Sequence, residues 1–134
     1  MEKIARAIGR DLPISTKNSV EVCNHIRGKS LKKSKYILQK VIEKEIAIPF
    51  RRFNTDRGHK RGNIAAGRYP IKSCSNILDL LNSAEHNAIN KGLNTNNLFV
   101  KNVIANRASR PFHSGRKIRR KMKRTHIEVI LEEK

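Results

Sequence analysis

The segment from Arg107 to Arg124 limits the possible folds of this chain most strongly, because it contains nine Lys and Arg residues and no Asp or Glu. Patterns typical of β-strands flank it: a β-branched run at Leu98–Ala105 and a period-two alternation from Ile127 to Leu131. Together they predict a long hairpin whose arm, about residues 107–124, has no apolar face to bury. We expect such an arm to become ordered only on an external partner.

The charge of the whole chain is unevenly distributed. Lys and Arg number 30 against 11 Asp and Glu, a net charge of +19. Besides the arm, the segment Phe50–Lys72 has seven basic residues against one acid, Asp56, and Lys29–Pro49 has a net charge of +4. The net charges of the segments 73–91 and 125–134 are −1 and −2. This pattern indicates a nearly neutral scaffold with several basic surfaces, and nucleic acid is the expected partner.

The remaining scaffold is predicted from apolar periodicity and capping residues. It consists of an irregular strand at Ile4–Ile14, a helix capped by Ser15 or Thr16 and ended by Gly28, a helix capped by Ser30 and stopped by Pro49, and a helix at Ser73–Lys91 ended by Gly92. The glycine-rich segment at about residues 49–72 has no sustained period and is predicted to be a loop. A loop of that length is usually functional or ordered by a partner.

Several classes of protein are excluded by composition. The chain has no run of about 18 apolar residues, which a transmembrane helix requires. The segment Met1–Ala5 lacks the apolar region of a secretory signal. Cys23 and Cys74 are isolated in the sequence, so we expect neither a disulfide framework nor a thiolate zinc site, and a reducing compartment fits best.

Catalytic and metal sites are not expected either. The five histidines show no metal-ligand spacing, so no metal or other cofactor is predicted. Glu85 and His86 are neighbours that point to different sides of a helix, which does not suit acid–base catalysis. A hidden RNA-processing activity would depend on one of these two residues or on His126. We therefore predict that the protein is not an enzyme.

Two nucleic-acid or nucleotide motifs are nearly matched. Gly62–Tyr69 approaches the phosphate-binding pattern G-x-x-x-x-G-K-[ST], but Arg68 and Tyr69 replace its last two residues. We interpret its glycines as allowing the backbone to approach an RNA phosphate chain. The helix junction at Arg27–Ser30 suggests a helix-turn-helix, yet the lysines of the second helix suit phosphates better than base edges. A plain helical hairpin is the preferred interpretation.

An ordered set of segments resembles one known family. They are Gly58–Pro70, Ser83–Ala88, Lys91–Leu93, Pro49–Asn54, Arg110–Arg116 and Thr125–Glu133. Through these segments the chain resembles the large-subunit ribosomal protein of the L-twenty-two family, which is numbered seventeen in eukaryotes. Pro49–Asn54 resembles the archaeal and eukaryotic branch. The similarity covers essentially the whole chain, although Leu98–Gly115 is shorter than the eukaryotic pattern.

The resemblance implies an α+β fold in one domain, residues 1–134, with three helices packed on a small antiparallel β-sheet and a long protruding basic β-hairpin. It also implies a structural role: the protein would tie together rRNA of the cytoplasmic large ribosomal subunit, beside neighbouring ribosomal proteins. The hairpin would line the nascent-peptide exit tunnel and meet the nascent peptide transiently. No membrane insertion is implied. The alternative is a free basic DNA-binding protein of the nucleoid type.

Candidate rRNA-binding residues are the cations and aromatic or histidine neighbours of the basic segments, which can contact phosphates and bases. They are Lys17, Arg27, Lys29, Lys32, Lys33, Arg51, Arg52, Arg57, His59, Lys60, Arg61, Arg68, Tyr69, Arg107, Arg110, Arg116, Lys117, Arg119, Arg120, Lys121, Lys123 and Arg124. By resemblance, the tunnel tip of the hairpin is Arg110, Pro111, Phe112, His113, Ser114, Gly115 and Arg116.

Overall fold

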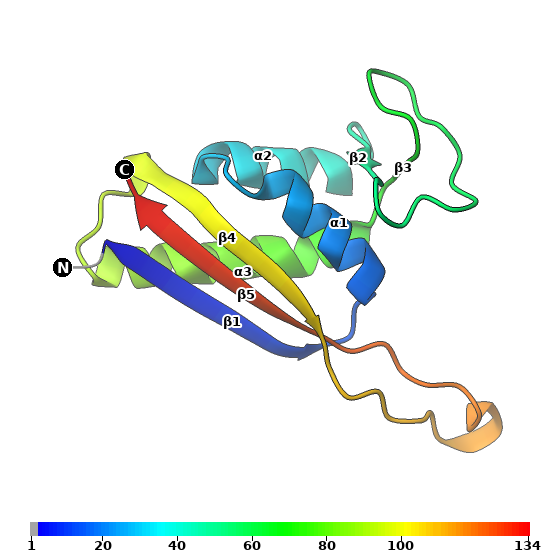
Figure 1. Ribbon diagram of the computed structural model, residues 1–134. Coiled ribbons are helices and arrows are strands. Elements are labelled where there is room, and N and C mark those ends of the chain that lie inside the picture. Colours follow the sequence, from blue (N-terminus) through cyan, green and yellow to red (C-terminus); the bar gives the residue numbers. More distant parts are fainter. Residues whose placement is uncertain (1–2) are drawn as a thin grey trace.

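A three-stranded antiparallel sheet and three helices make up the body of the protein (Figure 1). The computed structural model describes residues 3–134, so Met1 and Glu2 of the predicted domain lie outside the described residues. The sheet has the order β1-β5-β4, and its elements are β1 (Ile4–Leu12), β4 (Leu98–Arg107) and β5 (Thr125–Glu133). The helices are α1 (Thr16–Ile26), α2 (Leu31–Ile42) and α3 (Ile71–Asn90). The predicted α+β class, three helices on a small antiparallel sheet, is confirmed.

The core lies between one face of the sheet and the helices. Alternate residues of the central strand β5, Ile127, Val129 and Leu131, are fully buried. Their neighbours on β1 and β4 complete this face, since Ala7 and Val103 both pair with Val129. The helices α1 and α3 pack directly on this face, and α2 packs mainly on α3. The alternation in the sequence therefore buries one set of side chains and leaves the other set on the open face of the sheet.

Both ends of α1 follow the predicted signals. The Ser15 hydroxyl accepts a hydrogen bond from the backbone N–H of Asn18, as an N-cap does. Gly28 follows the last turn with a φ of +76°, a conformation that glycine adopts without a Cβ clash. Its N–H donates to the carbonyl of Val100 at 2.8 Å, which ties the α1–α2 turn to β4.

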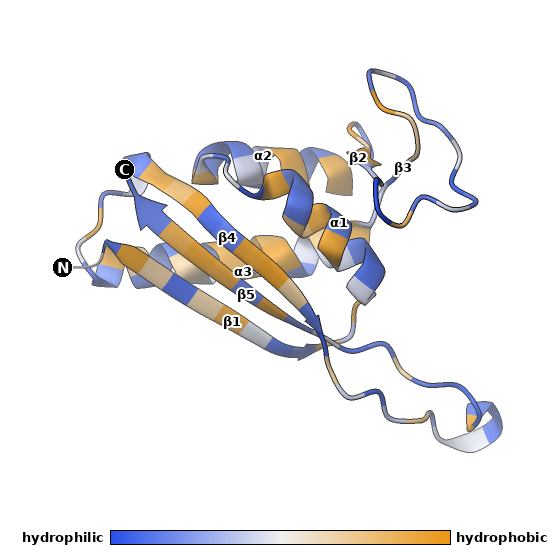
Figure 2. Cartoon of the chain, in the orientation of Figure 1, coloured by the Kyte–Doolittle hydropathy of each residue, from blue (hydrophilic) through white to orange (hydrophobic). Residues whose placement is uncertain are grey.

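Some elements differ from the predicted boundaries. The helix α3 begins at Ile71 and not at Ser73, because Pro70 is well placed just before a helix, where a missing N–H costs nothing. At the start of the predicted loop, β2 (Ile48–Pro49) pairs with β3 (Gly67–Arg68) farther along it, so the loop proper is Phe50–Ala66. Strands of two residues have no periodicity to detect. In Figure 2 this loop and the arm are mostly hydrophilic, whereas apolar residues concentrate in the helices and the sheet.

Candidate nucleic-acid interface

The arm continues from the ends of β4 and β5 and projects away from the body (Figure 1). The regular ladder ends where Arg107 pairs with Thr125. Beyond this pair, backbone bonds join Ala108 to Arg124 and His113 to Arg120, at 3.2 and 2.8 Å. A 3₁₀ turn at Gly115–Lys117 closes the end. The arm is thus a loosely bonded hairpin, and its backbone forms fewer internal hydrogen bonds than a continuous pair of strands would.

The surface of the arm is cationic, with some exposed apolar groups. Its Lys and Arg residues are exposed except Arg124, which is half-buried and lies 2.8 Å from the Asp11 carboxylate. Phe112 and Ile118 are 58% and 61% exposed. The Nζ of Lys121 lies 5.1 Å from the centre of the Phe112 ring. These apolar side chains of the arm therefore contact solvent and not the core.

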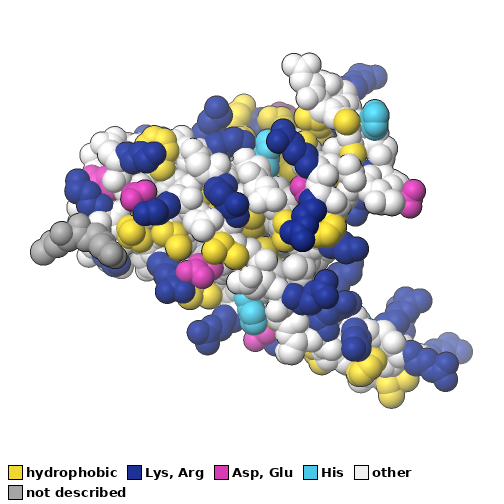
Figure 3. Space-filling view, viewed as in Figure 1, with side chains coloured by type: hydrophobic (Ala, Val, Ile, Leu, Met, Phe, Trp, Pro, Cys, Tyr) yellow, Lys and Arg dark blue, Asp and Glu magenta, His cyan; other side chains and the backbone are white. Residues whose placement is uncertain are grey.

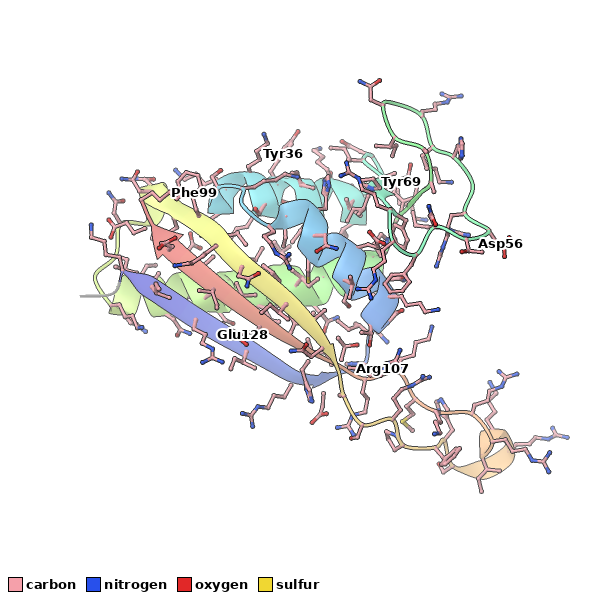
Figure 4. The ribbon with its side chains drawn as sticks, in the orientation of Figure 1. Tyr36, Asp56, Tyr69, Phe99, Arg107 and Glu128 are labelled. Carbon is pink, nitrogen blue, oxygen red and sulfur yellow. The ribbon has the colours of Figure 1, made fainter. Side chains whose placement is uncertain are left out.

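The second basic surface is the loop Phe50–Ala66, called the basic loop below. Its two sides are joined by hydrogen bonds from Phe50 N–H to the Ala66 carbonyl and from Lys60 N–H to the Ala65 carbonyl, both 2.9 Å. Gly67 allows the close packing of these sides, because a Cβ there would lie 2.9 Å from Cγ of Lys60. Asp56, the only acid of the loop, lies at its outer edge (Figure 4).

One buried carboxylate holds the start of the basic loop against α1. Glu21 is 3% exposed, and its oxygens accept backbone hydrogen bonds from Arg51, Arg52 and Phe53 at 3.2, 2.7 and 2.8 Å. The Phe53 ring beside this anchor is covered by two cations, Lys17 at 5.6 Å and Arg52 at 5.2 Å. The sequence does not indicate this role of Glu21, because nothing in its context distinguishes it from a solvated acid on a helix.

A groove of about 450 Å³ lies where the arm meets the body. Its lining comes from α1, the basic loop and both sides of the arm: Ser15, Thr16, Lys17, Asn18, Arg57, Arg107, Arg110, Lys123 and Arg124. We call it the arm-base groove. Six of these nine residues are Lys or Arg and none is acidic. The groove brings together cations that are up to 107 positions apart (124 − 17).

The first turn of α1 adds hydrogen-bond donors and a favourable dipole to the arm-base groove. A helix N-terminus presents free N–H groups and a partial positive charge, both of which attract anions. Ser15, Thr16 and Asn18 add hydroxyl and amide groups beside Lys17. In Figure 3, Lys and Arg side chains crowd the arm and its base, and Figure 4 places Arg107 at that junction. The chemistry of this groove suits phosphate groups.

A second groove, of about 320 Å³, lies along the C-terminal half of α1. It is lined by Glu21, Asn24, His25, Arg27, Lys29, Pro49 and Arg51, and we call it the α1 groove. Burial and the nearby charges of Lys29 and Arg51 lower the pKa of His25 from 6.5 to about 4. Burial, followed by the charges of Lys33 and Arg51, also lowers the pKa of Lys29. Asn24 and His25 were not among the predicted site residues.

The other predicted residues lie on separate parts of the surface. Lys32 donates to the amide oxygen of Asn96 at 2.7 Å, and Lys33 is exposed on α2. His59, Lys60, Arg61 and Tyr69 share a third groove of about 580 Å³ between the basic loop and Glu45. The Nζ of Lys60 lies 5.9 Å from the Tyr69 ring centre. Arg68 and the tip residue Arg116 are exposed outside these three grooves.

Glu85 and His126, two of the candidates for a hidden catalytic role, make structural contacts instead. Glu85 forms an ion pair with Lys35 at 2.5 Å, and the ring of His126 accepts the N–H of Asp11. Cys23 and Cys74 are buried free thiols, and burial raises the pKa of each to about 12. Residues 3–134 contain no group of three or more His, Cys, Asp and Glu that could hold a metal. Within the same residues, each helix is too short or too polar to cross a membrane.

Comparison with known proteins gives a consistent result. The family model described as Ribosomal protein L22p/L17e matches residues 7–132. A protein of Nanoarchaeum equitans is 42% identical over 142 residues, covering 99% of this chain and 80% of the relative. Proteins of Methanococcus aeolicus and Methanocaldococcus jannaschii are 39% and 40% identical, covering 98% of this chain and 90% and 89% of theirs. Each of the three is named "Large ribosomal subunit protein uL22".

Proposed function

Because this chain belongs to the ribosomal protein L22p/L17e family, we propose that it is a structural constituent of the large ribosomal subunit. In this role it binds large-subunit rRNA in the cytoplasm and catalyses no reaction. The family and its archaeal and eukaryotic branch, predicted from the sequence, are confirmed by the match over residues 7–132 and by archaeal relatives of about 40% identity.

The arm-base groove is the observation that carries the rRNA-binding proposal. It concentrates six cations and the N-terminus of α1 around a space of about 450 Å³. Guanidinium and ammonium groups form short charge-assisted hydrogen bonds with phosphate oxygens, and arginine often forms two at once. A phosphate chain that crosses this groove would contact the arm, the basic loop and α1 together. RNA binding would thereby fix the arm relative to the body.

The arm itself supplies a second reason for an RNA partner. Its exposed cations repel one another, and its exposed Phe112 and Ile118 gain nothing from the core. Folded RNA offers phosphates for the cations and base faces for the aromatic ring. The RNA would thus neutralise much of the +19 charge and supply the free energy that orders the arm.

We extend the proposal to the predicted tip residues Arg110–Arg116. They run from the arm-base groove, which Arg110 lines, to the 3₁₀ turn at Gly115–Lys117 at the far end of the arm (Figure 1). The tip residues Arg110–Arg116 would pass through rRNA and reach the wall of the exit tunnel, where they would meet the nascent peptide transiently. Family resemblance supports this extension.

The charges on the open face of the sheet are nearly balanced, with ion pairs such as Arg6–Glu128 at 2.6 Å and Lys101–Glu132 at 2.9 Å. This face would contact neighbouring proteins or solvent.

Sedimentation and salt titration test the proposal. We expect the protein to co-sediment with large subunits after a moderate-salt wash, and sedimentation with DNA would contradict it. Replacing Lys17, Arg107 and Lys123 by Gln should lower the salt slope of rRNA binding by about 2, because each phosphate contact contributes about 0.7–0.9. The matched control replaces Lys44, Lys91 and Lys101, which lie outside the arm-base groove, and should change the slope much less.

A further inference from the structure

The α1 groove differs in chemistry from the arm-base groove. Its volume of about 320 Å³ lies within the range of about 300–1,000 Å³ that is usual for small-molecule sites. Three cations, Arg27, Lys29 and Arg51, line it together with one acid, Glu21. The oxygens of Glu21 are occupied by the backbone N–H groups of the basic loop. The lining is therefore positive by two charges, and its acid is turned toward the loop backbone.

Two of the three cations of this groove are held in place by side-chain hydrogen bonds to backbone carbonyls. The Arg27 guanidinium donates to the carbonyl of Val103 on β4 at 2.8 Å, and Lys29 Nζ donates to the carbonyl of His25 at 2.5 Å. Glu21 holds the backbone of Arg51, whereas the Arg51 side chain is exposed. Because Arg27 and Lys29 are fixed by their side-chain hydrogen bonds, they lose little conformational entropy when an anion binds between them.

Two uncharged polar side chains lie beside these cations. Asn24 is exposed, and His25 is half-buried with its pKa lowered to about 4 by burial and by Lys29 and Arg51. At neutral pH the imidazole is uncharged and offers one donor and one acceptor, while the Asn24 amide offers both as well. Unpaired RNA bases are recognised by such groups on their edges, whereas phosphates prefer charged donors.

We propose that the α1 groove binds one unpaired RNA nucleotide, with its phosphate on Arg27, Lys29 and Arg51 and its base edge against Asn24 and His25. Pro49 completes the lining with an apolar ring that the base can contact. The inference rests on the proposed rRNA-binding function and adds base discrimination to it. The arm-base groove cannot supply discrimination, because phosphates are the same at every base.

Homopolymer oligoribonucleotides test this site. Binding of the full chain to 12-residue A, U and C oligomers is measured by fluorescence anisotropy at several salt concentrations. For the wild-type protein, the affinities for the strongest and the weakest of these oligomers should differ by a ratio of about three or more. Asn24→Ala and His25→Ala should each lower the affinity for the preferred oligomer about fivefold, reduce the affinity ratio and leave the salt slope unchanged. Arg51→Gln should lower the affinity for all three oligomers equally and reduce the salt slope by about 0.7.

Matched controls are His86→Ala and Asn90→Ala, exposed residues of α3 outside the α1 groove, which should leave the ratio unchanged. Asn24 is exposed, so its variant keeps the test valid even if His25→Ala is unstable. Equal binding of the three oligomers by the wild-type protein, or an unchanged ratio in Asn24→Ala, would overturn the nucleotide site alone. Salt-independent binding to every RNA would instead overturn the proposed function.

Discussion

The carboxylate of Glu21 lies 2.7 Å from the backbone nitrogen of Arg52 and accepts its hydrogen bond. The same group accepts the N–H groups of Arg51 and Phe53, so a helix residue determines the path of a loop that begins thirty positions later. Neither of the arginine side chains is consumed by the contact, since only backbone atoms take part. A single acid thus fixes the basic loop while its cations remain available to a ligand.

Glu21→Gln should destabilise the protein by about 2 kcal/mol, because hydrogen bonds to a charged group are worth about 1.5–3 kcal/mol each and an amide replaces them incompletely. Urea unfolding measures the free energy, and hydrogen exchange at residues 51–53 should accelerate. The control Glu43→Gln removes an exposed ion pair with Lys40 and should change stability much less, because solvent screens an exposed pair. Equal effects of the two variants would argue against the anchor.

Gly28→Ala should lower stability by about 1 kcal/mol, because the φ of +76° after α1 is strained for any residue with a Cβ. We expect a fall in Tm of about 4 °C, measured by thermal denaturation. Gly58→Ala is the matched control, since a Cβ there meets open space and its φ is not left-handed. A loss as large in Gly58→Ala would show that the backbone conformation is not the cause.

These local features are the part of the fold that the sequence predicts. Ser15 and Gly28 mark the ends of α1 through interactions within a few residues, and the alternation of β5 marks its buried face. The arm can be predicted in the same way, because its concentration of basic residues is visible without knowledge of the tertiary contacts.

The grooves and the anchor could not be predicted, because each joins residues that are distant in sequence. Lys17 and Arg107 look like two unrelated surface cations until the fold places them around one groove. Glu21 and His25 owe their roles to burial and to neighbours on the basic loop, and nothing in their sequence context indicates either. The two-residue strands β2 and β3 are stabilised by tertiary contacts and have no pattern of their own.

The low pKa of His25 should make stability depend on pH in a particular direction. The folded-state pKa of about 4 lies below the ordinary value of 6.5, so the unfolded chain takes up the proton first as the pH falls. The contribution of His25 is therefore complete above about pH 7 and is lost between about pH 6.5 and 4. When the pH is lowered from 7.5 to 5, the urea midpoint of unfolding should fall more for the wild type than for His25→Gln. His86→Gln should behave like the wild type.

Removal of the arm should leave the body folded. We expect a variant in which Asn-Gly replaces Arg110–Lys121 to keep the wild-type Tm within about 3 °C, because the arm contributes little to the core and the two residues can close a hairpin. The same variant should assemble poorly into large subunits, measured by gradient sedimentation. Unfolding of the truncated protein would contradict this account, since it would mean that the arm stabilises its own body.

Asp11→Asn should strengthen RNA binding. Asp11 pairs with Arg124 at 2.8 Å and is the acid that competes with a phosphate for this cation of the arm-base groove. Its φ of +54° lies in the left-handed region, which asparagine tolerates well, so the fold should be preserved. We expect affinity for an rRNA fragment to rise about threefold at 100 mM salt and less at higher salt, as counterions screen the released charge.

Asp56→Asn is a closely matched control for this variant. It makes the same change of charge at a residue with a φ of +55°, but at the outer edge of the basic loop (Figure 4). If net charge alone governed binding, both variants would gain affinity equally. A larger gain in Asp11→Asn, together with a steeper salt slope, is expected because only that change frees a cation that lines the arm-base groove. Equal gains would mean that Arg124 does not contact a phosphate there.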